Sequence, residues 1–151
     1  MDDFDLLVPI TRDEKETRDA KVIRALAMIA TTQEWVSNAR VCSAVVLDRD
    51  IVSTGVNQNK THPLARIYSK HPDCIKLHAE LDAIIRALKH ITPDELRRAT
   101  LYVCRVKQTI SKKNIFGIAK PCLGCARAIA AFGIKRVVYT NDDSTMTIIE
   151  D

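Results

Sequence analysis

Residues 76–90 read KLHAELDAIIRALKH, and the fold of the chain is decided around this stretch. Four apolar side chains recur there at helical intervals: Leu81, Ile84, Ile85 and Leu88. This spacing predicts a helix that buries one apolar stripe. His78 and Glu80 are two residues apart, which places them about 200° from each other on a regular helix of about 3.6 residues per turn. They cannot share a mid-helix face, so we expect them where the helix begins.

A second motif, PCLGC at residues 121–125, is predicted to open another helix. Cys122 and Cys125 stand at its start, and its apolar interior ends at Gly133, a natural left-handed C-cap. The positive dipole ends of two helix starts favour thiolate over thiol, and their unpaired N–H groups can donate to a bound ligand. We expect the two helix starts to converge on one site.

His78, Cys122 and Cys125 together offer one imidazole and two thiolates. A zinc ion that does chemistry takes three protein ligands and keeps its fourth position for water, so Zn2+ is the expected cofactor. Glu80 is then left to carry protons as the catalytic residue. A closed structural zinc site is the alternative, and it would need a fourth Cys or His ligand. The remaining candidates stand at no familiar ligand spacing from the cysteine pair: Cys42, Cys74, Cys104, His62, His71 and His90.

The chain of 151 residues suits one domain, 1–151, that buries a sizeable core. Its hydrophobic content of 46% is a globular value, and its apolar runs are too short to cross a bilayer. The acidic N-terminus lacks the features of a signal peptide, and the five cysteines are an odd number. We therefore expect a cytoplasmic protein without a membrane partner, whose other cysteines are buried free thiols. The net charge of +4 is compatible with anionic ligands but does not require them.

Elsewhere the sequence predicts one more helix, at residues 13–31, and five strands. The strands are expected at residues 40–48, 51–56, 100–105, 136–140 and 145–150. The first two form a hairpin that turns at Arg49 and Asp50. The last two must be antiparallel if they pair, because parallel strands need a crossover of about a dozen residues. Residues 106–120 are expected to form a β-ribbon or a flap, and residues up to 11 show no strong pattern.

Residues 58–76 are predicted to form a long basic loop directly before the metal helix. Its cationic side chains are Lys60, Arg66, Lys70 and Lys76, with His62 and His71 among them. A loop of this length within a compact domain is usually functional or disordered. Its position favours a role at the site, and a solvated charged surface is the alternative.

An HxE motif followed by PCxxC is the signature of zinc-dependent deaminases. Through HAE at residues 78–80 and PCLGC, the chain resembles the cytidine and deoxycytidylate deaminase superfamily. Three further segments support the resemblance: GVN at 55–57, LYV at 101–103 and IKRVVYT at 134–140. It covers about residues 40–140 and implies an α/β/α sandwich with a mixed five-stranded sheet. In many relatives the strand that holds LYV runs almost directly into PCxxC, whereas here residues 106–120 intervene and Lys120 precedes the proline.

The resemblance also implies the chemistry, which is zinc-dependent hydrolysis of the amino group at C4 of a cytosine ring. Asn57 is expected to hydrogen-bond the sugar, as the matching asparagine does in relatives. Ala79 is small and leaves room for the base beside the metal. Deoxycytidylate is the favoured substrate, with cytidine and deoxycytidine close behind, because three basic side chains can meet a 5′-phosphate: Lys60, His62 and Arg66.

Two other functions remain open. One is deamination of cytosine or adenine in single-stranded nucleic acid, although aromatic residues make up only 5% of the chain and only Tyr68 lies among the basic residues of the loop. The other is a zinc-stabilised interaction module without turnover, against which Glu80 argues because structure alone gives no reason for that carboxylate. The expected partners are therefore a small pyrimidine nucleotide or nucleoside, with single-stranded nucleic acid as the alternative, and further copies of the chain in a homo-oligomer.

Overall fold

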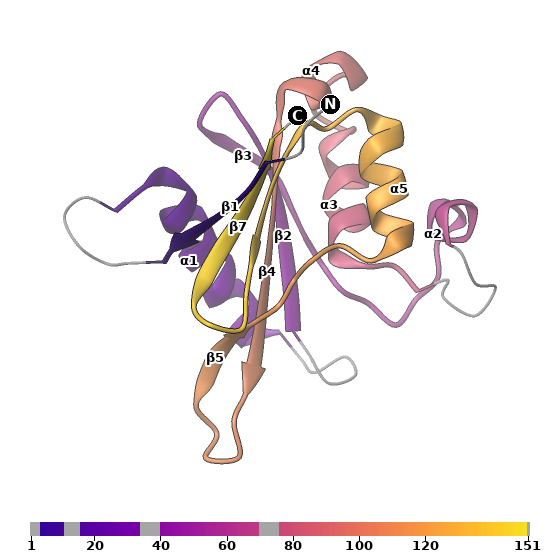
Figure 1. The fold of residues 1–151 in the computed structure, drawn as a ribbon. Helices are drawn as coiled ribbons and strands as arrows, with labels where there is room; N and C mark the ends of the chain where they lie inside the picture. The colour runs from indigo at the N-terminus through magenta and orange to yellow at the C-terminus, as the bar shows by residue number, and fades with distance from the viewer. Residues whose placement is uncertain (1–3, 11–15, 34–39, 70–75, 151) are drawn as a thin grey trace.

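The computed structural model describes residues 4–10, 16–33, 40–69 and 76–150, and one mixed β-sheet forms its centre (Figure 1). The strands are β1 Phe4–Pro9, β2 Arg40–Leu47, β3 Asp50–Val56, β4 Thr100–Gln108, β5 Asn114–Gly117, β6 Arg136–Thr140 and β7 Thr145–Glu150. Six of the described strands follow the order β1-β7-β6-β4-β2-β3, and β5 pairs with β4. Only the pair of β4 and β6 is parallel among the described strands.

Helices cover both faces of this sheet. They are α1 Arg18–Thr32, α2 Pro63–Tyr68, α3 Ala79–Ala87, α4 Pro93–Arg98 and α5 Leu123–Phe132. Figure 1 shows α1 on one side of the sheet, α3 and α5 on the other, and α2 beyond α5. The predicted three-layer α/β/α sandwich is therefore confirmed.

Each face has its own apolar core. Against α1, the buried set includes Ile23, Leu26, Tyr102 and Val138. Against α3 and α5, it includes Ile84, Leu101, Val103 and Ile129. A smaller cluster joins α2 to α5, where the rings of Tyr68 and Phe132 lie 6.3 Å apart between centroids. Helix α2 is thus held beside the start of α5 by apolar packing.

The predicted number of five strands was wrong, because the sheet has seven. One extra strand is β1, which adds to the sheet edge by antiparallel pairing with β7, for example Leu6 opposite Ile148. An edge strand is held by its hydrogen-bonded pairing with the neighbouring strand, so its own sequence can lack a clear alternation of apolar and polar residues. The other extra strand is β5, which turns part of residues 106–120 into the expected β-ribbon with β4.

The hairpin of β2 and β3 and the antiparallel pairing of β6 with β7 are confirmed. The hairpin turns one residue earlier than expected, at Asp48 and Arg49, whose φ angles are 50° and 78°. Positive φ at both positions is typical of the two-residue turn whose twist matches that of the flanking strands. Strand β3 therefore begins at Asp50 instead of residue 51.

The region predicted as one loop, 58–76, contains α2, so that prediction was too simple. Pro63 opens the helix, and His62 caps it by accepting a hydrogen bond at Nδ1 from the Leu64 N–H, at 3.1 Å. Lys70, His71 and Cys74 of the predicted loop lie outside the described residues. A further short helix, α4, was not predicted from the sequence, and a reciprocal capping box between Thr92 and Glu95 starts it.

The predicted helix at residues 13–31 is found as α1, but its start was placed too early, because Thr17 caps the helix and Arg18 begins it; residues 13–15 lie outside the described ranges. Two of the three remaining cysteines, Cys42 and Cys104, are buried free thiols as expected, although they face each other across β2 and β4. Burial raises the pKa of Cys42 to about 12, which keeps that thiol protonated. Within the described ranges, none of the helices has the length and apolar character that a membrane span needs.

Candidate metal centre and active site

His78 lies at the start of α3, as the sequence predicted. It is the N-cap residue, with extended backbone angles, and its side chain makes no capping hydrogen bond. The imidazole is therefore turned away from the helix backbone and toward the cysteines. Ala79 and Glu80 are the first two residues of the helix, and both are buried.

Two contacts explain why α3 begins at this point against β3. A Cβ atom on Gly55 would lie 2.4 Å from the Ala83 nitrogen and 2.6 Å from the Ala79 oxygen, so only glycine lets the strand and the helix approach this closely. Asp82 then joins the two elements, because its Oδ2 accepts hydrogen bonds from the Val56 N–H at 3.1 Å and from Gln58 Nε2 at 3.0 Å. Asp82 was not singled out from the sequence, since its partner strand is remote along the chain.

The second half of the site is the start of α5. Cys122 is the N-cap residue, and its Sγ accepts a hydrogen bond from the Cys125 N–H at 3.5 Å. The helix ends at Gly133 in the left-handed conformation, with a φ of 77°, as the sequence predicted. Two helix starts thus converge, and each brings its first backbone N–H groups to the same place.

The three expected metal ligands lie at ligand distances from one another. His78 Nδ1 is 3.4 Å from Cys122 Sγ and 3.5 Å from Cys125 Sγ, and all three donor atoms lie within 4.8 Å. Around a tetrahedral zinc ion with bonds of about 2.1 Å to nitrogen and about 2.3 Å to sulfur, N···S separations are about 3.6 Å. The donor set and its spacing therefore fit zinc, and no fourth Cys or His of the described residues joins the group.

The protonation of the ligands supports this fit. Hydrogen bonds from Cys125 and His78 lower the pKa of Cys122 to about 3, so this sulfur is a thiolate at neutral pH. The hydrogen bond to Cys122, together with burial, raises the pKa of Cys125. A dication bound by these residues would favour the thiolate form of both sulfurs.

Glu80 is only 6% exposed and lies beside these ligands. Burial raises the pKa of its carboxyl group, because the charged form loses its hydration. A carboxyl group whose pKa is moved toward neutrality can both accept and deliver a proton, which is what a general acid and base must do.

Two cavities meet at the metal ligands, and His78 and Cys122 line both. The catalytic cavity, defined as the one that contains Glu80, has a volume of about 310 Å³ and is also lined by Asn57 and Ala79. The α2–α5 cavity, of about 190 Å³, lies on the other side and includes Tyr68 and Lys76. A pocket of about 300 Å³ or more is large enough for a small ligand.

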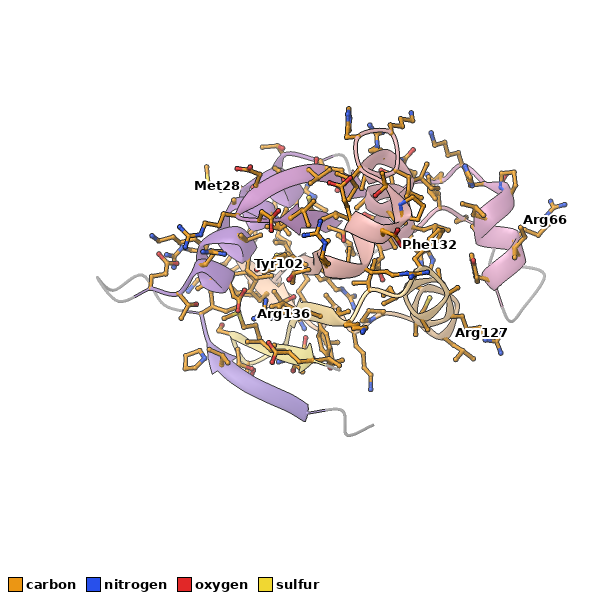
Figure 2. The ribbon with its side chains drawn as sticks, turned by 90° about the horizontal axis from the view of Figure 1, so that it is seen from above. Met28, Arg66, Tyr102, Arg127, Phe132 and Arg136 are labelled. Carbon is orange, nitrogen blue, oxygen red and sulfur yellow. The ribbon has the colours of Figure 1, made fainter. Side chains whose placement is uncertain are left out.

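Only some of the residues predicted to contact the substrate line a cavity. Asn57 lines the catalytic cavity, where its Oδ1 accepts hydrogen bonds from the Val41 N–H and from Gln33 Nε2, both at 3.0 Å. Lys60, His62 and Arg66 line neither cavity. His62 caps α2 instead, and Figure 2 shows Arg66 pointing outward from the far edge of the molecule.

The cavity also contains two cations that the sequence reasoning did not assign to substrate binding, Arg105 and Lys120. Arg105 lies on β4 two residues after Val103, so both side chains point to the same face of the sheet. The intervening residues of the β4–β5 ribbon separate these cations along the chain, and only the fold of that ribbon brings them to one wall. Side chains alternate between the two faces of a strand, so the spacing of residues 103 and 105 could have indicated that Arg105 faces the same side as Val103.

Comparison with known proteins agrees with this geometry. The family model described as the cytidine and deoxycytidylate deaminase zinc-binding region matches residues 16–141. The chain is 28% identical over 133 residues to the deoxycytidylate deaminase of Mycobacterium phage D29. The alignment covers 78% of this chain and 90% of the relative.

Two solved structures share the fold. The dCMP deaminase of cyanophage S-TIM5 in its apo form superposes with a TM-score of 0.56 at 19% identity, over 82% of both chains. The same enzyme in complex with dCMP and dUMP gives a TM-score of 0.54, also at 19% identity, over 80% of this chain and 79% of the other.

Proposed function

Because this chain belongs to the cytidine and deoxycytidylate deaminase family, we propose that it hydrolyses the amino group of a cytosine nucleotide, with dCMP as the favoured substrate and dUMP as the product. Cytidine and deoxycytidine are the next candidates. The observation that carries the proposal is the buried carboxyl group of Glu80 beside three metal ligands in a cavity that can hold a small ligand. The D29 relative and the S-TIM5 complex with dCMP and dUMP support a nucleotide as the substrate.

In the proposed mechanism, water adds at C4 of the cytosine ring and ammonia leaves. His78, Cys122 and Cys125 would hold the zinc ion, which would supply a water whose pKa is lowered from about 15.7 to about 7, so that hydroxide would be available at neutral pH. Glu80 accepts one proton of the attacking water and passes it to N3, and it later carries the proton of the C4 hydroxyl to the amino group, which leaves as ammonia while the C4 carbonyl forms. Backbone N–H groups at the starts of α3 and α5 stabilise the tetrahedral centre.

Several contacts belong to the same proposal. Asn57 hydrogen-bonds the sugar, and Ala79 leaves room for the base beside the metal ligands. Lys60, His62 and Arg66, which the sequence predicted as contacts of a 5′-phosphate, line neither cavity, so the proposal gives them no contact with the substrate. We further propose that residues 1–151 act as one domain, in the cytoplasm and as a homo-oligomer.

The direct test measures ammonia release by the zinc-loaded protein from dCMP, deoxycytidine, cytidine and a cytosine-containing single-stranded oligonucleotide. We expect dCMP to be used best and the oligonucleotide worst, with no release by Glu80→Gln. Faster release from the oligonucleotide would mean that the chain is a nucleic-acid deaminase. Absence of release from every substrate, by protein that holds zinc, would instead favour an interaction module.

A further inference from the structure

Arg105 and Lys120 are the only Lys or Arg side chains among the described residues that line the catalytic cavity. They come from opposite ends of the β4–β5 ribbon, which leaves the sheet after Arg105 and returns just before the cysteine motif. In Figure 1 this ribbon projects from the body of the molecule, so its base, and not its tip, borders the site.

The Arg105 guanidinium has capacity for a ligand. Its Nε is buried and has no hydrogen-bond partner among the described residues, and its Nη1 makes one long hydrogen bond of 3.4 Å to the Ile118 oxygen. Protein atoms cover the Nε–H group, so the donors that can meet a ligand in the cavity are those on the outer nitrogens of the guanidinium. The guanidinium offers five N–H donors in a fixed fork, which matches the oxygens of a phosphate group.

Lys120 is the second cation of this wall. It is exposed, and among the residues that the structure describes it forms no ion pair. It directly precedes Pro121 and the metal ligand Cys122, so the backbone between the lysine and the metal centre has little freedom. An anion attached to a substrate at the metal centre would meet the lysine ammonium near this point.

The base of the ribbon is fixed by the end of β6. Thr140 is fully buried, donates a hydrogen bond of 2.7 Å to the Gly117 oxygen and accepts one of 3.1 Å from the Arg105 N–H. Asp142 accepts hydrogen bonds at Oδ1 from the Ile118 N–H and from Lys107 Nζ, both at 3.0 Å. These contacts hold both strands of the ribbon before any ligand binds, so little ordering is needed when an anion arrives.

We propose that Arg105 and Lys120 form the subsite that binds the phosphate group of the substrate, and that this group is the 5′-phosphate monoester of a single nucleotide. The inference rests on the proposed function, since it identifies the part of a cytosine nucleotide that the cavity selects. Asn57 lies on the same cavity, and Val41, whose N–H group it binds, pairs with Arg105 across β2 and β4. The sugar contact and the phosphate contact therefore lie on neighbouring strands.

The observations favour a mononucleotide over a phosphodiester of a nucleic-acid strand. Proteins that hold single strands stack the bases on aromatic rings. None of the described side chains that line the catalytic cavity is aromatic. The volume of about 310 Å³ is near the lower limit of known ligand pockets, which suits one small ligand.

The test compares nucleotide with nucleoside in Arg105→Gln, Lys120→Gln and the double variant. The ratio of kcat/KM for dCMP to that for deoxycytidine should fall about tenfold in each single variant, because each loses a charge-assisted hydrogen bond. Arg105→Lys should restore part of the ratio. Arg127→Gln is the matched control, because Arg127 is an exposed residue of α5 that lines neither cavity; Figure 2 shows its position.

Gly117→Ala provides a variant that keeps the charge. A Cβ atom on Gly117 would lie 3.1 Å from Arg105 Cδ and 3.2 Å from Cγ, so the arginine must shift. The ratio should fall in this variant too, although by less than in Arg105→Gln. Melting curves establish that each variant is folded before its kcat/KM ratio is compared with that of the wild type.

Calorimetry with dUMP and deoxyuridine separates the subsite from the proposed reaction, because binding of the product needs no turnover. Tighter binding of dUMP that depends on Arg105 and Lys120 supports the subsite even if no ammonia is released from any substrate. The subsite is wrong if both ratios, kinetic and binding, stay within twofold of wild type in the double variant. It is also wrong if Lys60→Gln or Arg66→Gln lowers them instead, or if an oligonucleotide is deaminated faster than dCMP.

Discussion

Glu80 combines burial with a position beside three metal ligands, and this combination separates it from an ordinary surface carboxylate. An unpaired buried carboxylate destabilises a protein, since the charged form loses its hydration. Burial raises the pKa of Glu80, which is the second residue of α3 and lies two positions after the ligand His78. A residue kept in such a place is expected to act on protons.

Replacing Glu80 with Gln should leave the metal content unchanged and lower turnover by at least about a thousandfold. The amide keeps the shape of the side chain but cannot carry a proton, and positioned general acids and bases contribute about 100-fold to 10,000-fold. Metal analysis beside the ammonia assay tests this. Turnover within tenfold of wild type would contradict the assigned role.

Gly55 controls how closely β3 approaches α3. Gly55→Ala should destabilise the fold by about 3 kcal/mol or more, in the range of strong single-residue effects, because the new Cβ meets the backbone of Ala79, Asp82 and Ala83 at 2.9 Å or less. Since α3 carries His78, zinc affinity should fall as well. Urea unfolding and zinc titration measure the two effects, and a loss of less than 1 kcal/mol would show that the helix can move away without harm.

At the scale of elements, the metal site is a joint between α3 and α5. These helices belong to separate parts of the chain, and His78, Cys122 and Cys125 lie together where the two helices start. Binding of zinc to a site formed only in the folded state adds directly to the free energy of unfolding.

Removal of the metal should therefore lower the melting temperature. A ligand present at about 100 times its Kd stabilises the folded state by about 2.7 kcal/mol, and each kcal/mol shifts the melting temperature of a chain of this size by roughly 2–4 °C. We expect a chelator to lower it by at least about 5 °C, and Cys125→Ser to remove this difference. Equal melting curves with and without chelator would show that zinc does not join the helices.

At the scale of the whole molecule, α1 is joined to the central strands β4 and β6 by a half-buried polar cluster. The Arg136 fork binds both carboxylate oxygens of Asp19, at 3.0 and 2.6 Å, and the Tyr102 hydroxyl donates to Oδ1 at 2.5 Å. Burial pushes the pKa of Asp19 upward, but these hydrogen bonds and the charge of Arg136 outweigh it and lower the pKa.

A lowered carboxyl pKa means that Asp19 contributes stability above its unfolded pKa of about 3.9, and that this contribution is lost as the pH falls through the lower folded pKa. Asp19→Asn should cost about 1–3 kcal/mol at pH 7 and pH 5, and the difference from wild type should shrink below about pH 4. Urea unfolding of metal-free protein across this range provides the measurement.

Glu150→Gln is the control for this experiment. Glu150 binds the same arginine at 2.7 Å, but its side chain is 54% exposed. An exposed ion pair contributes about 0–1 kcal/mol. If both variants cost the same and neither difference depends on pH, the cluster around Asp19 does not stabilise the fold in the way described.

The sequence by itself determined the metal centre. His78 and Glu80 have to stand at a helix start because of the angle between successive helical residues, and Cys122 and Cys125 share one short motif that opens a helix. These are local rules, so they hold whatever the rest of the chain does. The hairpin of β2 and β3 and the antiparallel β6 and β7 were predictable for the same reason, because short links limit how strands can pair.

Tertiary structure alone decided the edge of the sheet and the wall of the catalytic cavity. Strand β1 exists through its pairing with β7, at the other end of the chain. The cations expected at the site, Lys60 and Arg66, are near it in sequence but line neither cavity, whereas Arg105 and Lys120 reach the wall. The physical reason is that a cavity wall is made by strands that pair across long separations, and the pairing of β4 with both β2 and β5 is what carries Arg105 to that wall.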